Sequence, residues 1–381
     1  MNGRGAARWT DRQHPWIYRT DVAEAPRTEA GVVRVRGPAG GVIGMALWSP
    51  MSAISLRMLT RAEREVDAAF WRERLAAAAA YRATLGPDAT AYRLAHAEAD
   101  GLPSLIVDRY GEYLVVQLLS AGLEQQRANV LEALLDVFAP RGILGRNDVP
   151  VRQHERLPRR SELLHGHVPE TIEVRESGVR YLAAPWLGQK TGAFLDQREN
   201  RVRAGMLARG RVLDCFAYHG SFALHLAGSA EEVTVVDSSA GALDRARANI
   251  ELNGLENVRP VEANVFELLR ARDAEGAPYD TIVLDPPAFA KRRDAVNQAL
   301  RGYKEINLRA LRLLAPGGVL CTFSCSYHVD RAAFRTMLES AAADAGRPVR
   351  WLETRGQASD HPEILQIPES SYLKGAILQV V

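Results

Sequence analysis

From about residue 187 to its C-terminus, the chain alternates short apolar segments with longer amphipathic ones. The apolar segments are rich in Val and Leu, as buried strands are, and a helix-like segment follows each of them. The strand-like segments are GRVLDCFA, EEVTVVD, VRPVEAN, YDTIVLDPP and GGVLCTFSCS. This alternation predicts an α/β domain whose parallel sheet is covered by helices on both faces.

The first part of the chain has a different pattern. Residues 31–37, 40–50 and 52–60 alternate apolar with polar side chains and are broken by glycine and proline, which predicts a small, twisted β-domain. Residues 64–85 predict a helix with one apolar side, which ends at the glycine and proline of positions 86–87.

The middle of the chain mixes strands with one helix. A strand pair with Gly111 in its turn, an amphipathic helix and a hairpin are predicted in YRLAHAEADGLPSLIVDRYGEYLVVQLLS, LEQQRANVLEALLDVFAP and TIEVRESGVRYLAAP. The polar and basic residues 149–167 predict a loop. A chain of 381 residues has room for two or three domains. We expect a small β-domain (1–74), a central α+β domain of EEHEE-like order (75–186) and the α/β domain (187–381).

Composition limits the class of protein. The chain is 47% hydrophobic and 25% charged, which is ordinary for a globular protein with real cores. No apolar stretch is long enough to span a bilayer, and the N-terminus lacks the apolar core of a signal peptide, so we expect a cytoplasmic protein without a membrane partner. Three cysteines cannot form a disulfide framework, and no Cys/His spacing resembles a metal site.

Charge is nearly balanced overall but not locally. The formal net charge is +2, whereas residues 1–61 contain nine arginines and four acidic residues, a net charge of +5. A basic surface of this kind is compatible with phosphate contacts, and solvated arginines without a partner explain it equally well.

Ligands of parallel sheets bind beyond the carboxyl ends of the strands, where this chain places polar residues. Asp214 and Gly220 follow the first strand, and Gly220 permits close backbone approach where a helix begins. Asp237 ends the second strand, where a carboxylate can accept both hydroxyls of a ribose. Asn264 ends the third strand and can bond a base edge. Both Asp237 and Asn264 are also good helix N-caps.

The motif DPPAF (285–289) closes the fourth strand. Its two prolines restrict the backbone and remove its donors, so the carboxylate of Asp285 is held at the edge of the sheet. Phe289 can stack on a planar base. Rigid strand ends seldom serve packing alone, and the motif therefore favours a functional site.

Two of the three cysteines lie in the last strand-like segment. Cys321 is in the middle of the segment and is best explained as a buried apolar residue. Cys325 is at its end, on the same rim as Asp285. A thiolate there is suited to add to C6 of a pyrimidine, which would make C5 able to accept a methyl group, while Asp285 bonds N3 of a cytosine. A cysteine chosen for size alone is the other interpretation.

These segments resemble the bacterial 23S ribosomal RNA cytosine-C5 methyltransferases that carry an N-terminal PUA domain, over nearly the whole chain. RQHPWIYRTDV resembles the start of the PUA module, and EADGLPSLIVDRYG resembles the central domain. The catalytic domain is represented by KTGAFLDQREN, VLDCFAYHGSF, VLDPPAFAK, RGYKEINLRAL, TFSCS and SYLKG. The resemblance implies a class I, Rossmann-like methyltransferase that uses S-adenosylmethionine. It implies 23S rRNA or a large-subunit assembly intermediate as partner, and family members are often homodimers.

The resemblance also implies roles for individual residues. Asp214 and Gly220 would line the methionine end of the methyl donor, Asp237 its ribose and Asn264 its adenine, while KTGAFLDQR would form an extra wall. Cys325 would be the nucleophile. The expected cofactor-binding residues are Asp214, Phe216, Gly220, Asp237, Asn264, Asp285, Lys190, Thr191, Asp196 and Gln197.

The chain departs from the family pattern at several positions. His219 stands where threonine is usual, Ser221 where glycine is usual, and Asn264 where aspartate is usual. Related cytosine-C5 methyltransferases have a second cysteine before the proline of the fourth-strand motif. This family and this chain have Asp285 there, which leaves the base that removes the C5 proton unassigned.

Basic residues near the DPP motif are expected to bind RNA. Charged side chains that follow the motif would hold phosphates without reading sequence, although a solvated loop explains them as well. The expected RNA-binding residues are Phe289, Lys291, Arg292, Arg293 and, in the PUA-like segment, Arg12.

Two other functions remain open on the sequence. DPP-F loops also occur in enzymes that methylate exocyclic amines or guanine N7, and such enzymes need no thiol. A noncatalytic RNA-binding protein could use the sheet as a scaffold. A requirement for Cys325 would distinguish cytosine-C5 methylation from the first alternative. Binding of S-adenosylmethionine would distinguish an enzyme from the second.

Overall fold

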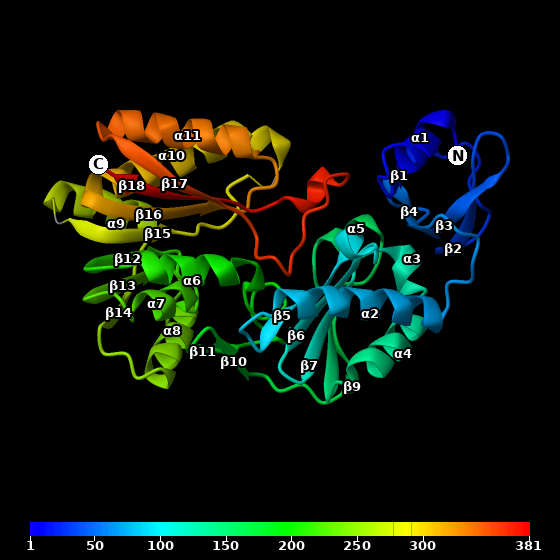
Figure 1. Cartoon of the computed structure of the whole chain (residues 1–381), viewed down its shortest axis with the longest axis horizontal. Helices are drawn as coiled ribbons and strands as arrows, with labels where there is room; N and C mark the ends of the chain where they lie inside the picture. The colour runs from blue at the N-terminus through cyan, green and yellow to red at the C-terminus, as the bar shows by residue number, and fades with distance from the viewer. Residues whose placement is uncertain (277, 291) are drawn as a thin grey trace. The chain divides into compact units, whose positions relative to one another are not determined.

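The computed structural model describes residues 1–276, 278–290 and 292–381 (Figure 1). The chain divides into two compact units, each assembled from several stretches of sequence. The first unit comprises Met1–Val174, Ala183–Leu195 and Ser359–Ser370, and the second comprises Arg175–Leu182, Asp196–Ala358 and Ser371–Val381. The three domain boundaries expected from the sequence stay a prediction.

The second unit contains a seven-stranded sheet in the order β14-β13-β12-β15-β16-β18-β17. Its strands are β12 (Arg211–Cys215), β13 (Glu232–Asp237), β14 (Val258–Glu262), β15 (Tyr279–Leu284), β16 (Leu314–Ser324), β17 (Val349–Arg355) and β18 (Lys374–Val380). The strand order reverses beside β12, because β13 and β14 lie on one side of it and β15 lies on the other. Such a reversal is the usual ligand site of a doubly wound sheet.

The sheet is parallel from β14 to β16, as the alternation predicted, but not at its other edge. β18 pairs antiparallel with both β16 and β17. The segment between β17 and β18, all of it described, contains the short 3-10 turn Pro368–Ser370 and no α-helix. Without a helical crossover, the last strand returns in the opposite direction.

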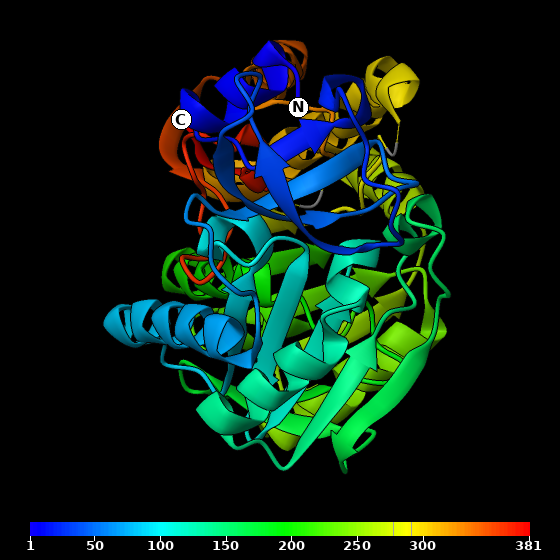
Figure 2. The same cartoon turned by 90° about the vertical axis from the view of Figure 1, so that its right-hand side faces the viewer.

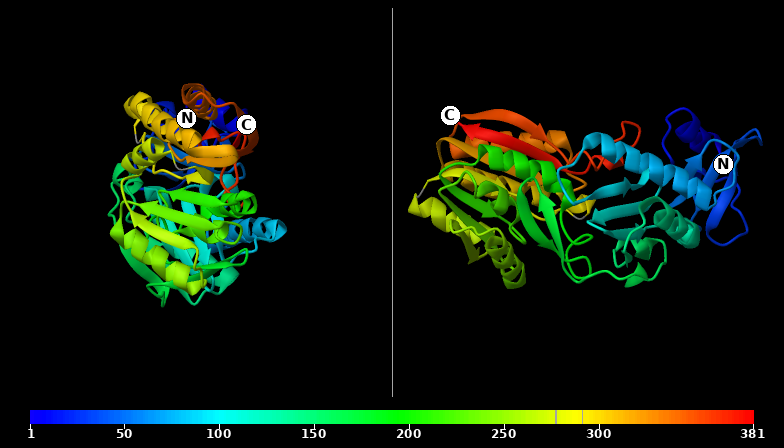
Figure 3. Two further views of the ribbon diagram at one scale, coloured as in Figure 1. Left: turned by 90° about the vertical axis from the view of Figure 1, so that its left-hand side faces the viewer. Right: turned by 60° about the horizontal axis from the view of Figure 1, so that its bottom comes forward.

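Helices cover both faces of this sheet (Figure 3). Alternate residues of one strand point to opposite faces, so Leu213 packs with α9, α10 and α11, and its neighbour Val212 packs with α6, α7 and α8. The helices are α6 (Arg198–Leu207), α7 (Ser221–Leu226), α8 (Ala240–Leu252), α9 (Val265–Glu275), α10 (Val296–Leu313) and α11 (Arg331–Ala345). The prediction of a doubly covered α/β domain is confirmed.

The first unit begins with the predicted small β-domain. Helix α1 (Gly3–Thr10) precedes a sheet of order β1-β4-β3-β2. Its strands are β1 (Trp16–Tyr18), β2 (Gly31–Arg36), β3 (Val42–Trp48) and β4 (Ile54–Thr60). Helix α2 (Ala68–Leu85) starts four residues later than predicted, because the carboxylate of Asp67 caps it by accepting from the Phe70 amide at 2.9 Å.

A five-stranded sheet of order β5-β6-β7-β8-β9 completes the first unit, with α2 and α4 packed against it (Figures 2 and 3). The elements are β5 (Ala91–His96), β6 (Leu105–Tyr110), β7 (Tyr113–Leu118), α3 (Ala121–Glu124), α4 (Arg127–Phe138), β8 (Gly142–Arg146), α5 (Val151–His154) and β9 (Ser161–Gly166). No helix within the described part of the chain is long and apolar enough to cross a bilayer.

The loop predicted at 149–167 is partly wrong, since α5 and β9 lie within it. β9 is the edge strand of this sheet and pairs with β8, and most of its side chains are exposed. Charged and polar residues on an edge strand hide it from hydrophobic patterning. The predicted hairpin is present as β10 (Ile172–Glu176) and β11 (Val179–Ala183), with Ser177 and Gly178 in its turn.

Candidate active site

The loop that follows β12 has an unusual backbone. Phe216, Tyr218 and Gly220 have φ values of 61°, 52° and 78°, so every second residue is in the left-handed region. Glycine adopts this conformation readily, whereas an aromatic residue does so only when its surroundings enforce it. Close packing adds to the constraint at Gly220, where a Cβ atom would lie 3.3 Å from the Cβ of Ala246 in α8. Backbone strain of this kind concentrates at functional sites.

Asp214 is fully buried at the end of β12. Its Oδ2 accepts from the Ala223 amide at 3.1 Å, while Oδ1 has no hydrogen-bond partner among the described residues. Burial raises the pKa of Asp214 well above its usual value, and the carboxylates of Asp285 and Asp237 raise it further. An unpartnered buried acceptor surrounded by like charge fits a ligand that brings a cationic donor, such as the ammonium group of an amino acid.

Asp237 joins the ends of two strands. Its Oδ2 accepts from the Tyr218 amide and its Oδ1 from the Ser239 amide, both at 2.9 Å. The cap of helix α8 is Ser239, whose hydroxyl accepts from the Ala242 amide, so Asp237 is not the N-cap. The carboxylate is half-buried and fixed at the rim of the sheet, where a ribose-binding acid is expected.

Asn264 lies two residues beyond the end of β14 and is exposed. Its Oδ1 accepts from the amides of Phe266 (2.9 Å) and Glu267 (3.4 Å), so it is the N-cap of α9. The capping role is thereby observed, and an adenine contact stays a prediction.

Asp285 follows β15 directly, next to the end of β12. Its amide donates to the Cys215 carbonyl at 3.4 Å, and its Oδ1 accepts from Nε2 of Gln197 at 2.8 Å. Gln197, expected as part of a cofactor wall, therefore holds the carboxylate of the DPP motif. Asp196, its neighbour, is buried and accepts from the hydroxyl of Tyr372 at 2.8 Å.

Cys321, within β16, and Cys325, just after it, differ as the sequence predicted. Cys321 is fully buried within the strand, and burial raises its pKa to about 12, which keeps the thiol protonated. Cys325 follows the last residue of the strand and is partly exposed, with its Sγ 3.8 Å from the carbonyl oxygen of Pro286. The partly exposed thiol and the DPP motif therefore meet at neighbouring strand ends.

A hydrogen-bond cluster fixes the backbone next to Cys325. Ser326 Oγ lies 2.8 Å from the hydroxyl of Tyr303 and accepts from the Ala290 amide at 3.1 Å. Lys374 Nζ donates to the carbonyls of Ser326 (2.6 Å) and Tyr372 (2.8 Å). The cluster ties the segment after β16 to the segment after β15.

Lys374 is almost fully buried, and sequence reasoning missed it as a site residue. Burial lowers its pKa to about 8, and interaction with Cys325 opposes that shift. The β16–β18 pairing sets Lys374 opposite Ser324, one residue before the cysteine. Its presence in SYLKG was the only sequence signal for it.

Phe289 belongs to an aromatic cluster. Its ring centroid lies 4.5 Å from that of Tyr303, 5.8 Å from that of Phe266 and 6.3 Å from that of Phe216. Gly302 of α10 leaves room for the ring, since a Cβ there would lie 3.3 Å from it. Phe289 is only partly buried, and its stacking on a base stays a prediction.

The first unit contains two of the residues expected to bind the cofactor. Thr191 is buried and donates to Oδ2 of Asp108 at 2.6 Å, and its hydroxyl lies 3.1 Å from that of Tyr110. Lys190 is exposed, with Nζ 4.6 Å from the centroid of the Phe194 ring. The segment KTGAFLDQREN passes from the first unit to the second after Leu195, and cofactor contacts of Lys190 and Thr191 stay predictions.

The arginines expected to bind RNA are exposed. Arg292 and Arg293 follow the DPP motif, and Arg292 Nε lies 3.4 Å from Oδ1 of Asp294. Lys291 is outside the described residues. Arg12 is exposed after helix α1 in the first unit. Their contacts with phosphate stay predictions.

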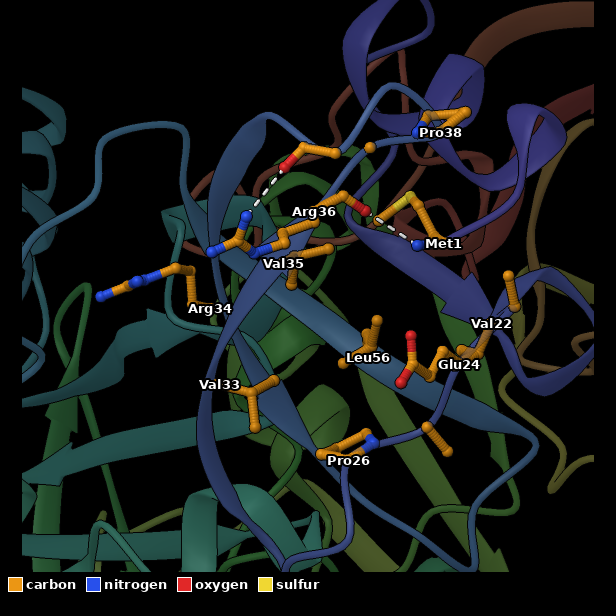
Figure 4. Close-up of a pocket in the computed structure, with 14 residues that line it drawn as sticks. Met1, Val22, Glu24, Pro26, Val33, Arg34, Val35, Arg36, Pro38 and Leu56 are labelled. Carbon is orange, nitrogen blue, oxygen red and sulfur yellow. Dashed lines mark hydrogen bonds between the residues drawn. The ribbon is translucent and has the colours of Figure 1, made fainter.

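A pocket of about 450 Å³ lies in the small β-domain (Figure 4). Val33, Val35 and Leu56 give it an apolar wall, while the amino group of Met1 donates to the carbonyl of Arg36 at 2.8 Å. All of its lining residues belong to the first unit, so it contains none of the strand-end side chains.

Known proteins resemble the chain in sequence and in fold. Residues 102–374 match the family model of S-adenosylmethionine-dependent methyltransferases, and residues 3–61 match that of the PUA-like domain. The chain is 42% identical to ribosomal RNA large subunit methyltransferase I of Shewanella amazonensis, over 99% of this chain and 98% of that protein. It is 38% identical to the protein of the same name from Vibrio vulnificus, again over 99% and 98%.

Two solved structures, each 22% identical in sequence, match the fold. One is a SAM-dependent methyltransferase from Streptococcus mutans, with a TM-score of 0.83 over 99% of this chain and 98% of that chain. The other is a methyltransferase complexed with SAH, with a TM-score of 0.86 over 100% and 98%.

Proposed function

The chain belongs to the S-adenosylmethionine-dependent methyltransferases, within the ribosomal RNA large subunit methyltransferase I family, and we propose that it methylates C5 of a cytosine in 23S ribosomal RNA through a covalent adduct of Cys325. The observation that carries this proposal is the placement of Cys325 and Asp285 at neighbouring strand ends. Sγ of Cys325 lies 3.8 Å from the carbonyl of Pro286, the residue after Asp285.

The cofactor is S-adenosylmethionine, and the rim at β12 and β13 suits it. Asp214 offers an unpartnered buried acceptor for the ammonium group, and Asp237 offers a fixed carboxylate for the ribose hydroxyls. Phe216, Gly220 and Asn264 complete this part of the proposed site. When bound, the cofactor supplies an electrophilic methyl group, which an activated C5 carbon accepts.

Cys325 opens the proposed reaction. Its thiolate forms a bond to C6 of the cytosine, and the electron pair of the C5–C6 double bond moves toward N3, which leaves C5 nucleophilic. Asp285 shares a proton with N3 and so stabilises the negative charge that develops on the ring. Loss of the C5 proton to a base then re-forms the double bond and expels the thiolate, so the first bond made is the last one broken.

The charge of Lys374 supports the nucleophile. A cation near a thiol favours the thiolate, and Lys374 interacts electrostatically with Cys325 while it holds the carbonyl of the next residue. Burial raises the pKa of the two buried cysteines, Cys215 and Cys321, and at Cys321 it outweighs the opposing charges of Arg355 and Arg203. The rim thiol is therefore the one suited to covalent catalysis.

Large-subunit rRNA is the proposed substrate because the curated relatives are named ribosomal RNA large subunit methyltransferase I. The chain matches these relatives over nearly their whole length. The PUA-like segment, with its net basic charge, is proposed to contribute phosphate contacts. An assembly intermediate as the physiological substrate and a homodimer as the active form stay predictions.

A covalent trap tests the proposal. A 23S transcript that contains 5-fluorocytidine should form a complex with the unaltered protein that survives denaturing electrophoresis, because fluorine at C5 blocks the final elimination. Cys325→Ala should abolish both the complex and methyl transfer, by about 1000-fold or more. Cys321→Ala, a matched change of a buried thiol, should leave the complex intact.

Methyl transfer by Cys325→Ala at the rate of the unaltered protein would refute the covalent mechanism. Mass spectrometry of 23S rRNA from a strain lacking the gene should show that a single 5-methylcytidine is lost. Loss of a methyl group from guanine N7 or from an exocyclic amine would instead establish the alternative target.

A further inference from the structure

A directed chain of hydrogen bonds leads from β17 to the carboxylate of the DPP motif. Arg355 Nε donates to Oδ1 of Asn200 at 2.9 Å, and Nδ2 of Asn200 donates to Oε1 of Gln197 at 2.6 Å. Gln197 Nε2 then donates to Oδ1 of Asp285 at 2.8 Å. The four residues linked by these hydrogen bonds all lie in the second unit.

The direction of this chain is fixed at its first link. A guanidinium group has only donors, so Arg355 requires the oxygen of the Asn200 amide to face it. The carbonyl of Gly356 has only acceptor capacity, and it receives a second bond from Nδ2 of Asn200 at 2.9 Å. Both neighbours therefore demand the same orientation of the Asn200 amide.

The Asn200 amide in turn fixes the orientation of the Gln197 amide. Its Oε1 is occupied by the N–H of Asn200, so its amide nitrogen must face Asp285. Asn200 and Gln197 are each only 2% exposed, where water cannot replace a lost partner. Arg355 is held in turn by the carbonyl of Glu199 at 3.3 Å and the carboxylate of Glu353 at 3.4 Å.

We propose that Arg355 and Asn200 are positioning residues that act through Gln197 to keep Oδ1 of Asp285 an acceptor, so that the proton shared with the pyrimidine N3 is carried by Oδ2. This inference rests on the proposed function, in which Asp285 bonds N3. It gives Gln197 a second role besides the cofactor wall implied by the family resemblance. A carboxylic acid with a random choice of protonated oxygen would present its proton to the base only part of the time.

Asn200→Asp reverses the chain with almost no change of shape. An aspartate still accepts from Arg355, but it must also accept from Gln197, which turns the Gln197 oxygen toward Oδ1 of Asp285. We expect kcat/KM for methyl transfer to 23S rRNA to fall about 30-fold, with the affinity for S-adenosylmethionine within about threefold. Calorimetry measures that affinity, and the thermal midpoint reports folding.

Gln197→Glu supplies a signature that a structural role would not give. Two adjacent carboxylates share one proton, which raises the pKa of the pair, and the introduced carboxyl group, once protonated, can again donate to Oδ1 of Asp285. The activity of this variant relative to the unaltered protein should therefore rise as pH falls. The ratio removes the pH dependence of the Cys325 thiolate, which both proteins share.

Arg355→Met should have a smaller effect, about fivefold, because Gly356 still orients Asn200. Arg350→Met is its control, since Arg350 is exposed on the same strand and lies outside the chain of bonds. The expected order of loss is Asn200→Asp, then Arg355→Met, with Arg350→Met unchanged.

The proposal is overturned if Asn200→Asp keeps the kcat/KM of the unaltered protein, or if the Gln197→Glu ratio does not change with pH. The nature of the product separates this failure from failure of the proposed function. If the unaltered protein makes 5-methylcytidine and these variants behave like it, only the positioning chain is wrong. If the product is another methylated nucleotide, the cytosine mechanism is wrong whatever the variants do.

Discussion

The two halves of the strand-end rim are built in different ways. The donor half, residues 214–220 and Asp237, is shaped by backbone: Asp237 accepts two main-chain amides, and alternate residues of the loop have positive φ. The target half, residues 285–290 and 324–326, is held by side chains such as Gln197, Tyr303 and Lys374. Backbone geometry is hard to alter by one substitution, whereas a side-chain network fails link by link. Changes in the donor half should therefore affect cofactor affinity, and changes in the target half should affect the reacting groups.

Among the substitutions that test this difference between the two halves, we expect Asp214→Asn to have the largest effect. Removing the charge weakens the bond expected from the ammonium group of S-adenosylmethionine, and its Kd should rise about 50-fold by calorimetry. Because the pKa of Asp214 is raised, a cation binds best after this group has lost its proton. The affinity of the unaltered protein should thus fall as pH falls, and that of Asp214→Asn should not.

Asp244→Asn is the control for this change, because Asp244 is an exposed residue of α8 paired only with Arg247 among its described neighbours. Alkylation of Cys325 by iodoacetamide should proceed at the same rate in Asp214→Asn and in the unaltered protein. A slower alkylation would mean that the donor half also controls the nucleophile, and the division of the rim would then be lost.

Lys374→Met probes the target half with an intermediate effect. Loss of the cation raises the pKa of the Cys325 thiol, so alkylation at pH 7 should slow about tenfold, which corresponds to a shift of one pKa unit. Since the pKa of Lys374 is about 8, the difference between the two proteins should narrow as pH rises past that value. Lys304 of α10 forms an ion pair with Asp344 of α11, and Lys304→Met should leave the rate of Cys325 alkylation unchanged.

Most of the rim could be predicted from the sequence because its signals are local. Strand ends, the DPP motif and the contrast between Cys321 and Cys325 all follow from short stretches of apolar and polar residues. The links that hold these groups are not local. Arg355 and Asn200 are 155 residues apart, and Lys374 is 48 residues from Ser326.

Long-range pairing depends on strand order, which periodicity does not reveal. β18 brings Lys374 beside the end of β16 only because it inserts antiparallel between β16 and β17. The positive φ values of Phe216 and Tyr218 were also invisible, since neither residue type favours the left-handed region. The edge strand β9 was missed for the opposite reason, because its exposed side chains look like those of a loop.

His219 should give the smallest effect, and it lies in the donor half. Its ring stacks on that of Tyr181, with 5.3 Å between the ring centroids, and its Nε2 is buried without a hydrogen-bond partner in the described part of the chain. Burial lowers its pKa to about 3, and the positive charges of Arg201 and Arg245 lower it further, against the opposing charge of Glu176. The unfolded chain therefore takes up a proton at His219 below about pH 6.5, while the folded chain does not until about pH 3.

Stability from this group is thus present above pH 6.5 and is lost as pH falls toward 3. Threonine is the residue usual in the family at this position. Between pH 7 and pH 6, the unfolding free energy of His219→Thr, measured by urea titration, should fall by about 0.7 kcal/mol less than that of the unaltered protein. His165→Thr, at an exposed position of β9, should leave that loss unchanged. If His219→Thr lost as much stability over this range as the unaltered protein, His219 would take up its proton equally in the folded and the unfolded chain, and burial would not keep its ring neutral in the donor half.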